Sequence, residues 1–368
     1  MNRIIIVGNG FDLAHGVKTS YKDFIEWYLG KVVEKLKRDY YYKDELLEVR
    51  LQRTRHNSFE LPDYLYLDSP KEIFQNIEKD GYIFECLPFL RRIISGIENK
   101  GWVDIETDYY ELLKDYALNK RGDVKQLNEE LSYIEKKLIE YLKEVEKGYF
   151  SPNPIIKTFG EEIKKMIYEG IALRDVSLKY NRSSRNKEQD KQGKVVLLNF
   201  NYTKIADQYF GNENADFFVN HIHGKLDDED SVIFGYGDEL DKKYKEIEEL
   251  NDNEYLEKIK SVKYLERDNY RKMQAFIDEP FQVYIMGHSC GNSDRTLLNT
   301  IFEHENCVSI KPFYYAYKDK EGNDRDNYTE IVRNITRNFN DKQLLRERVV
   351  NKTYCKPLPQ SEIKCSIN

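Results

Sequence analysis

The chain has 368 residues, of which 40% are hydrophobic and 13% aromatic, enough for one large domain or two of ordinary size. Its formal net charge of -7 does not favour a dominant nucleic-acid surface. No run approaches the roughly 18–20 apolar residues that cross a bilayer, and the N-terminal apolar run is too short for a secretory signal. The five cysteines are scattered without a Cys-x-x-Cys pair, so a cytoplasmic protein without a disulfide framework or thiolate zinc site is expected.

Short β-branched runs bounded by turn residues predict strands buried on both faces, as in a parallel sheet, at 4–7, 195–200, 232–234, 283–286 and 308–310. Between 124 and 147, apolar residues recur every three or four positions, which predicts a long amphipathic helix. Further helices are expected at 21–42, 156–171, 244–276 and 329–339, and a polar loop at 179–194.

The predicted fold class is α/β, with a Rossmann-like, mostly parallel sheet and a large helical insertion. The expected parts are a discontinuous core of residues 1–30 and 194–350, a helical insertion at 31–193, a smaller helical excursion at 240–278, and a C-terminal tail at 351–368.

The first predicted strand runs directly into Gly8-Asn9-Gly10, and Gly16 follows six residues later. This spacing differs from the G-x-G-x-x-G dinucleotide fingerprint, but it shares the physical logic. Missing side chains let the backbone approach a phosphate or a ribose. Residues 11–15 are expected to form an extra loop or a first helical turn, with Asp12 near the mouth, where it accepts a ribose hydroxyl. An ordinary strand-to-helix turn explains these glycines equally well.

Asparagine and histidine pairs follow later strands. Asn199 and Asn201 are two positions apart, as are His221 and His223, so each pair faces one way on an extended strand end. A carboxamide orients a water or hydroxyl, and a histidine takes a proton near neutral pH, which favours base-assisted attack by water or by a substrate hydroxyl. Gly224 is expected to leave the His223 imidazole open to a ligand, whereas His221 is interpreted as a hydrogen-bonded strand-end residue.

Two other functions remain open at this point. A metal-dependent hydrolase or nuclease would use His221 and His223 with Asp238 or His288 as ligands. A non-catalytic sensor would bind a nucleotide in the same pocket and pass the change to a partner through the insertion. The nucleotide-hydrolase hypothesis requires no metal.

Gly287-His288-Ser289 also follows a predicted strand, but it is not the G-x-S-x-G nucleophile elbow. Ser289 is expected to contact a ligand through its hydroxyl or backbone, and Asp294 to cap the next helix. The predicted insertion contains Trp102, Asp104 and Glu106. These residues could close over the site and supply a carboxylate. We prefer the interpretation that they begin a helix, because acidic residues are favoured at a helix N-terminus.

Six segments in order resemble the abortive-infection AbiH family of bacterial anti-phage proteins: IIIVGNGFDLAHGVKTSYKDF, WVDIE, LNFNYT, HIHG, IFGYGDE and GHSCGNSD. The resemblance extends from Met1 to about Phe313 and implies a role in defence against bacteriophage. A nucleotide is the expected partner, a phage-derived trigger and a homo-oligomer stay open, and neither a membrane nor a nucleic acid is favoured.

More distantly, the core resembles the sirtuin-like NAD-binding fold, which has the same glycine spacing in its cofactor loop. This resemblance implies that Asn201 orients water and ribose and that His223 is the base while the nicotinamide–ribose bond of NAD is hydrolysed. Asp12 departs from the family's serine, and the cysteine pairs of the sirtuin zinc module are missing, so protein deacylation is not expected. The implied residues for binding NAD, as substrate or ligand, are Gly8, Asn9, Gly10, Phe11, Asp12, Gly16, Gly224, Gly287, His288 and Ser289.

Overall fold

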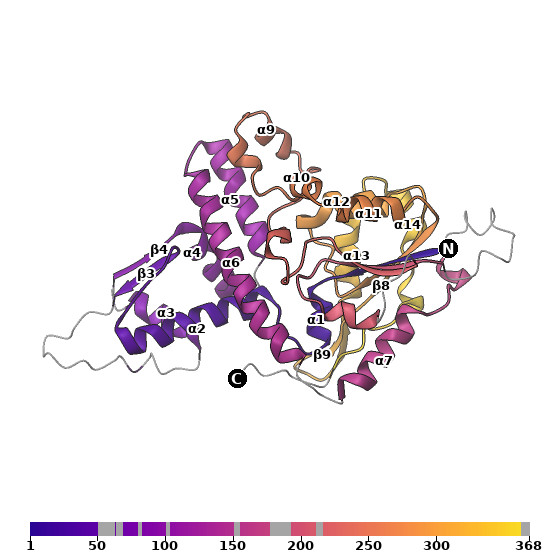
Figure 1. Cartoon of the computed structure of the whole chain (residues 1–368), viewed down its shortest axis with the longest axis horizontal. Helices are drawn as coiled ribbons and strands as arrows, with labels where there is room; N and C mark the ends of the chain where they lie inside the picture. The colour runs from indigo at the N-terminus through magenta and orange to yellow at the C-terminus, as the bar shows by residue number, and fades with distance from the viewer. Residues whose placement is uncertain are drawn as a thin grey trace, which may run out of the picture. The chain divides into compact units, whose positions relative to one another are not determined.

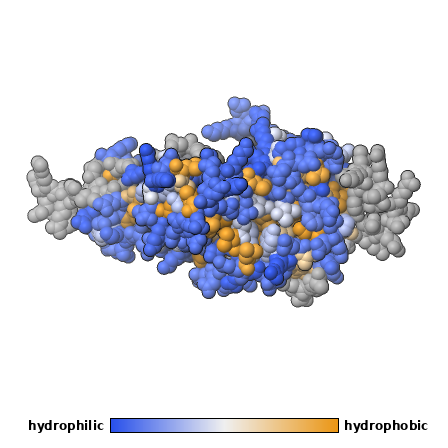
Figure 2. All heavy atoms as spheres, turned by 90° about the horizontal axis from the view of Figure 1, so that it is seen from above, coloured by the Kyte–Doolittle hydropathy of each residue, from blue (hydrophilic) through white to orange (hydrophobic). Residues whose placement is uncertain are grey.

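The computed structural model describes residues 1–50, 63, 69–79, 83–100, 104–150, 155–176, 193–210 and 216–361 (Figure 1). The chain divides into two compact units. The sheet unit consists of Met1–Thr19, Leu142–Lys245 and Lys258–Asn368, and the insertion unit of Ser20–Tyr141 and Glu246–Glu257. In the described ranges, no helix is long and apolar enough to cross a membrane. Figure 2 shows mostly hydrophilic residues on the visible face, in keeping with the 33% of charged residues.

The sheet unit is built on five strands that are parallel throughout, in the order β6-β5-β1-β7-β8. The strands are β1 (Asn2–Val7), β5 (Val195–Asn199), β6 (Phe217–His221), β7 (Phe281–Met286) and β8 (Cys307–Phe313). The predicted parallel α/β sheet is confirmed. Val7 pairs with Asn199 and with Met286, so the loops after β1, β5 and β7 begin side by side at one edge. In sheets of this kind, ligands bind outside the carboxyl ends of the strands.

One strand prediction was wrong, and one strand was not predicted. The segment 232–234 is a buried loop, in which Ile233 hydrogen-bonds to the backbone of His223. The edge strand β6 was missed because its apolar run is only three residues long and most of the strand is half-buried. An edge position lowers the hydrophobic signal that identifies inner strands.

Alternation of side chains divides the sheet into two buried faces. Ile4 and Ile6 pack with neighbouring strands and with the helices at 269–276, 295–302 and 328–337 in one hydrophobic core. On the opposite face, the Arg3 guanidinium lies 4.2 Å from the centroid of the Tyr284 ring and donates to the Ile167 carbonyl. The helices of the sheet unit include α1 (Asn9–Ala14), α7 (Ile155–Ile167), α11 (Asn269–Phe276), α12 (Arg295–Phe302), α13 (Tyr328–Arg337) and α14 (Lys342–Arg348). A small antiparallel pair joins β9 (Ala316–Lys318) to β10 (Asp324–Asp326).

The insertion unit contains a small antiparallel sheet beside its helices, and the sequence did not predict this sheet. Its antiparallel sheet has the order β2-β3-β4, formed by Tyr41–Lys43, Leu47–Arg50 and Ile83–Cys86. Its helices are α2 (Tyr21–Asp39), α3 (Pro70–Lys79), α4 (Pro88–Lys100), α5 (Ile105–Asn119) and the first part of α6 (Val124–Tyr149). The long amphipathic helix is confirmed as α6, because Leu127, Leu131 and Ile134 are buried.

Asp104 caps the first turn of α5, since its side chain accepts from the Thr107 backbone at 3.0 Å. Glu106 is buried in the same turn. The acidic helix start is therefore present, while Trp102 lies outside the described residues.

The compact units divide the chain differently from the expected ranges. Residues 142–176 belong to the sheet unit, because buried Ile163 and Ile167 of α7 pack in that unit and Arg3 of β1 bonds to Ile167. Most of the predicted loop at 179–194 lies outside the described residues. The segment 244–276, which the sequence predicts to be helical, is broken into short helices: α9 (Tyr244–Glu248), η6 (Asn253–Leu256), α10 (Lys260–Lys263), η7 (Tyr264–Glu266) and α11. Asn251, with φ of +53°, interrupts it.

Candidate functional site

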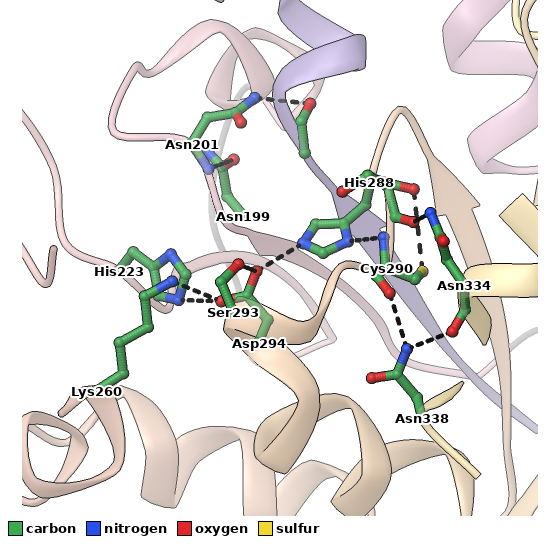
Figure 3. A network of polar contacts seen from close by, with 12 residues as sticks. Asn199, Asn201, His223, Lys260, His288, Cys290, Ser293, Asp294, Asn334 and Asn338 are labelled. Carbon is green, nitrogen blue, oxygen red and sulfur yellow. Dashed lines mark hydrogen bonds and ion pairs between the residues drawn. The ribbon is translucent and has the colours of Figure 1, made fainter. Parts of the chain in front are cut away.

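The loop after β5 turns back onto the loop after β1. Asn199 causes the turn: its Oδ1 accepts from the Asn201 backbone at 2.9 Å, and its Nδ2 donates to the Thr203 carbonyl at 3.1 Å. Asn201 lies next to Asn199 in this loop (Figure 3). Its Nδ2 donates to the Gly8 carbonyl at 3.0 Å and to Asp12 Oδ1 at 2.8 Å. Segments almost two hundred residues apart in sequence are thus joined through one amide group.

The glycines after β1 pack against the loop after β7. A Cβ on Gly8 would lie 2.6 Å from His288 Cα, and one on Gly10 would lie 2.8 Å from the Gly287 carbonyl oxygen. The Gly10 N–H donates to that same oxygen at 2.8 Å. The expected phosphate cradle is therefore filled by protein backbone in this arrangement. Gly16, with φ of +79°, follows the end of α1, and this left-handed position favours glycine.

The sequence predicts Asp12 at the mouth of a loop, but the structure places it in the interior. Its side chain is 1% exposed and accepts from Asn201 and, at 2.6 Å, from Thr203 Oγ1. Burial raises the pKa of Asp12 to about 7, against the opposing effect of those two hydrogen bonds. Phe11 is also buried, with its ring centroid 4.5 Å from that of His15. Among the predicted binding residues, Asn9 and Ser289 are exposed.

An Asp12→Asn variant is expected to become more stable relative to the wild type as the pH rises from about 4 to about 8, by roughly 1–4 kcal/mol. The folded pKa is raised above the unfolded value, so this group's stabilisation is present below the unfolded pKa and is lost as the pH rises through about 7. Asparagine keeps the acceptor for Asn201 and does not ionise. Urea unfolding across this range measures the difference, and parallel pH profiles for the two proteins would contradict the expectation.

The second part of the site is the Asp294 cluster, which consists of Asp294, Lys260, His223, His288 and Ser293 (Figure 3). Lys260 Nζ lies 2.8 Å from Asp294 Oδ1, and the two side chains are 1% and 10% exposed. Burial alone would raise the pKa of Asp294, but Lys260 and the two histidines together hold it well below its usual range. The cluster therefore contains an ionised carboxylate that Lys260 neutralises. Asp294 precedes α12, but its side chain makes no capping bond there, contrary to expectation.

His223 is enclosed on both sides of its ring. Its Nε2 is 2.9 Å from the Tyr264 hydroxyl and 3.4 Å from Asp294 Oδ1, and the Phe200 backbone also hydrogen-bonds to the imidazole. Burial, followed by Lys260, lowers the pKa of His223 to about 3, so the ring is neutral at physiological pH. The sequence predicts that Gly224 leaves the His223 ring open to a ligand, but in the structure this glycine has another role. With φ of +81°, it admits the Ser231 carbonyl, which would lie 2.1 Å from a Cβ there.

His288 connects the cluster to the glycine turn. Its Nδ1 accepts from the Cys290 backbone at 2.9 Å, so in the neutral ring Nε2 carries the proton and faces Asp294 Oδ2 at 3.5 Å. Helix α13 fixes this loop, because Asn334 donates to the Ser289 carbonyl and Asn338 to the Cys290 carbonyl. Gly8 packs directly beneath His288, which places the cluster next to the β1 loop.

Only two of the alternative metal ligands are brought together, because His223 and His288 both lie in the Asp294 cluster. His221 Nε2 instead bonds to Asp207 Oδ1 at 2.9 Å, and Asp238 pairs with Arg295 at 3.4 Å. Across the described parts of the chain, no three His, Cys, Asp or Glu side chains form a group that could hold a metal ion.

Sequence reasoning missed Lys260 and Tyr264, and it gave Asp294 a different role. Lys260 lies in a lysine-rich helical stretch, where a solvated position is the ordinary expectation. Lys260 is nevertheless only 1% exposed, because its ammonium group bonds to Asp294, which lies 34 residues away in sequence. A local signal existed only at Asp294, which follows the Gly-His-Ser segment closely.

A comparison with protein-family models decides the family. The model described as bacteriophage abortive infection AbiH matches residues 4–316. This chain belongs to the AbiH family. The family description indicates an anti-phage abortive-infection role. No curated protein matches the AbiH chain in sequence.

Proposed function

We propose that this AbiH protein is a cytoplasmic abortive-infection effector that hydrolyses the nicotinamide–ribose bond of NAD or a related nucleotide. The observation that supports this is the convergence of Asn201 and His223 on one sheet edge. Asn201 bonds to Gly8, and His223 reaches Gly8 through Asp294 and His288. The sirtuin-like resemblance assigns the ribose chemistry to the same two residues.

The proposed reaction adds water across one bond. The water oxygen attacks the ribose carbon, the carbon–nitrogen bond breaks, and nicotinamide leaves with the bonding electron pair. His223 takes the proton from water, and Asn201 orients the water or the ribose. Both N–H groups of the Asn201 amide are donated to Gly8 and Asp12, so its Oδ1 is the group assigned to orientation.

The enclosed imidazole fits a resting form of this enzyme. A base works best when its pKa lies near the working pH, and the burial that lowers the pKa of His223 to about 3 makes it a weak base. Tyr264 and Lys260 belong to one short segment, so withdrawal of that segment would free Nε2 and rehydrate the ring. The pKa would then return toward 6.5. A phage-derived trigger is proposed to cause this withdrawal.

A non-catalytic nucleotide sensor is the second candidate. The His223 ring hydrogen-bonds to the Tyr264 hydroxyl and to the Phe200 backbone. These two bonds are as typical of a structural histidine as of a resting base, which favours the sensor. A sensor would retain a nucleotide without turning it over.

Phage-triggered wild-type protein is expected to release nicotinamide from NAD, and His223→Ala is expected to reduce that rate by about 100-fold or more. Chromatography of the purified protein with NAD, with and without lysate of phage-infected cells, measures the release. His304→Ala is the matched control, since His304 is half-buried beside the amino end of β8 and bonds to the Asn306 backbone. Circular dichroism checks that both variants fold.

The outcomes separate the candidates. Nucleotide that co-purifies with the protein, without NAD loss under any trigger, would identify a sensor. If NAD stays intact and mass spectrometry finds no bound nucleotide, both candidates are wrong.

A further inference from the structure

A surface pocket of about 880 Å³ lies within the sheet unit, beside the loops that follow β5 and β6. Its walls come from the last turns of α6, from η4 (Ile205–Tyr209) and from the loop after His223. Small-molecule sites in proteins have volumes of about 300–1,000 Å³, so the pocket is large enough for a nucleotide. None of the predicted binding residues lines it.

Charged groups of the pocket suit a molecule that carries both phosphate and ribose. Lys204 pairs with Asp227 at 2.7 Å, and Lys143 pairs with Glu229. Exposed Lys147 forms no ion pair with any described residue, which leaves its ammonium group for an anion. The carboxylate of Asp227, which also lines the pocket, is an acceptor suited to ribose hydroxyls.

An apolar surface lies beside these charges. Phe150 is 47% exposed, and Phe210 and Leu226 also line the pocket. A planar base that packs on Phe150 would remove apolar area from water, and aromatic side chains are common stacking partners for bases. An inorganic anion alone would leave this surface exposed.

We propose that the pocket binds the nucleoside diphosphate part of a nucleotide, with Lys147 on the phosphates, Asp227 on a ribose and Phe150 against the base. The proposal deepens the proposed function, because it gives the nucleotide a recognition site separate from the closed glycine turn. Two hydrogen bonds connect the pocket to Asp12 in the site. Glu146 accepts from the Lys204 backbone at 2.7 Å, and the preceding residue, Thr203, donates to Asp12.

Isothermal titration of the full chain with ADP tests the pocket without any need for catalysis. Wild type is expected to bind ADP and ADP-ribose more tightly than adenosine or inorganic phosphate. Adenosine lacks the phosphates that would contact Lys147, and inorganic phosphate lacks the base that would pack on Phe150. Lys147→Ala and Phe150→Ala are each expected to weaken ADP binding by about fivefold or more, and Lys147→Arg is expected to restore it. Lys165→Ala, an exposed lysine on α7, is the matched control.

His223→Ala is expected to bind ADP like the wild type, which separates this proposal from the proposed hydrolysis. Loss of ADP binding in Lys147→Ala supports the pocket even if no form of the protein consumes NAD. Undetectable ADP binding to the wild type, or equal ADP affinity in wild type, Lys147→Ala and Phe150→Ala, would overturn the pocket. So would NAD hydrolysis with an unchanged KM in Lys147→Ala.

Discussion

A Lys260→Met variant is expected to lose about 3–5 kcal/mol of unfolding free energy at about pH 8, because it leaves an unpaired carboxylate in the protein interior. Lys260 is 1% exposed, and its ammonium group is the nearest cation to Asp294, at 2.8 Å. Methionine fills a similar volume without the charge. Urea unfolding at equilibrium measures the loss.

The loss is expected to be smaller at about pH 6. In the wild type, Lys260 helps to lower the pKa of His223, while Asp294 acts to raise it. Without Lys260, a proton on His223 compensates the carboxylate, so the folded pKa of the histidine rises. A histidine with a raised folded pKa contributes stability below its unfolded pKa and loses that contribution as the pH rises through the folded value. An equal loss at both pH values would contradict this account.

A double variant, Lys260→Met with Asp294→Asn, isolates the ion pair. It is expected to recover most of the lost stability, because asparagine keeps the acceptor for His288 without a charge. Lys165→Met on the exposed face of α7 is the control for replacing a lysine by methionine, and a change within about 0.5 kcal/mol is expected there.

Gly287→Ala is expected to cost about 4 kcal/mol or more, because two separate mechanisms act at one position. With φ of +75°, the residue is left-handed, which alone disfavours a side chain. A Cβ there would lie 2.0 Å from the Phe11 backbone nitrogen, and backbone atoms cannot move aside as a flexible side chain does. The loops after β1 and β7 would have to separate. Thermal and chemical unfolding measure the effect.

Gly160→Ala is the matched control for that substitution. Gly160 lies within α7, and beyond the local backbone of its own helix no atom of the described residues comes within 4 Å of a Cβ built there. Alanine is the better helix former, so this variant is expected to gain up to about 1 kcal/mol. If Gly287→Ala were as stable as Gly160→Ala, the close packing of the two loops would be wrong.

Local patterns were sufficient for much of the scaffold. The β-branched runs at β1 and β7 and the apolar stripe of α6 bury their side chains by simple periodicity, which can be read from neighbouring residues. Edge strand β6 and the broken helices before α11 have weaker periodicity, because each buries only part of its surface.

For the site, the sequence determined which segments matter, namely the polar and glycine residues that follow the inner strands, together with the motifs of the AbiH family. Only the tertiary structure decided what those residues contact. Glycine after a strand has the same local pattern whether a phosphate or another loop fills the space, and here the β7 loop fills it. The pairing of Lys260 with Asp294 depends on two distant segments being buried together, and the free energy of a charge depends on that burial rather than on neighbouring residues in sequence.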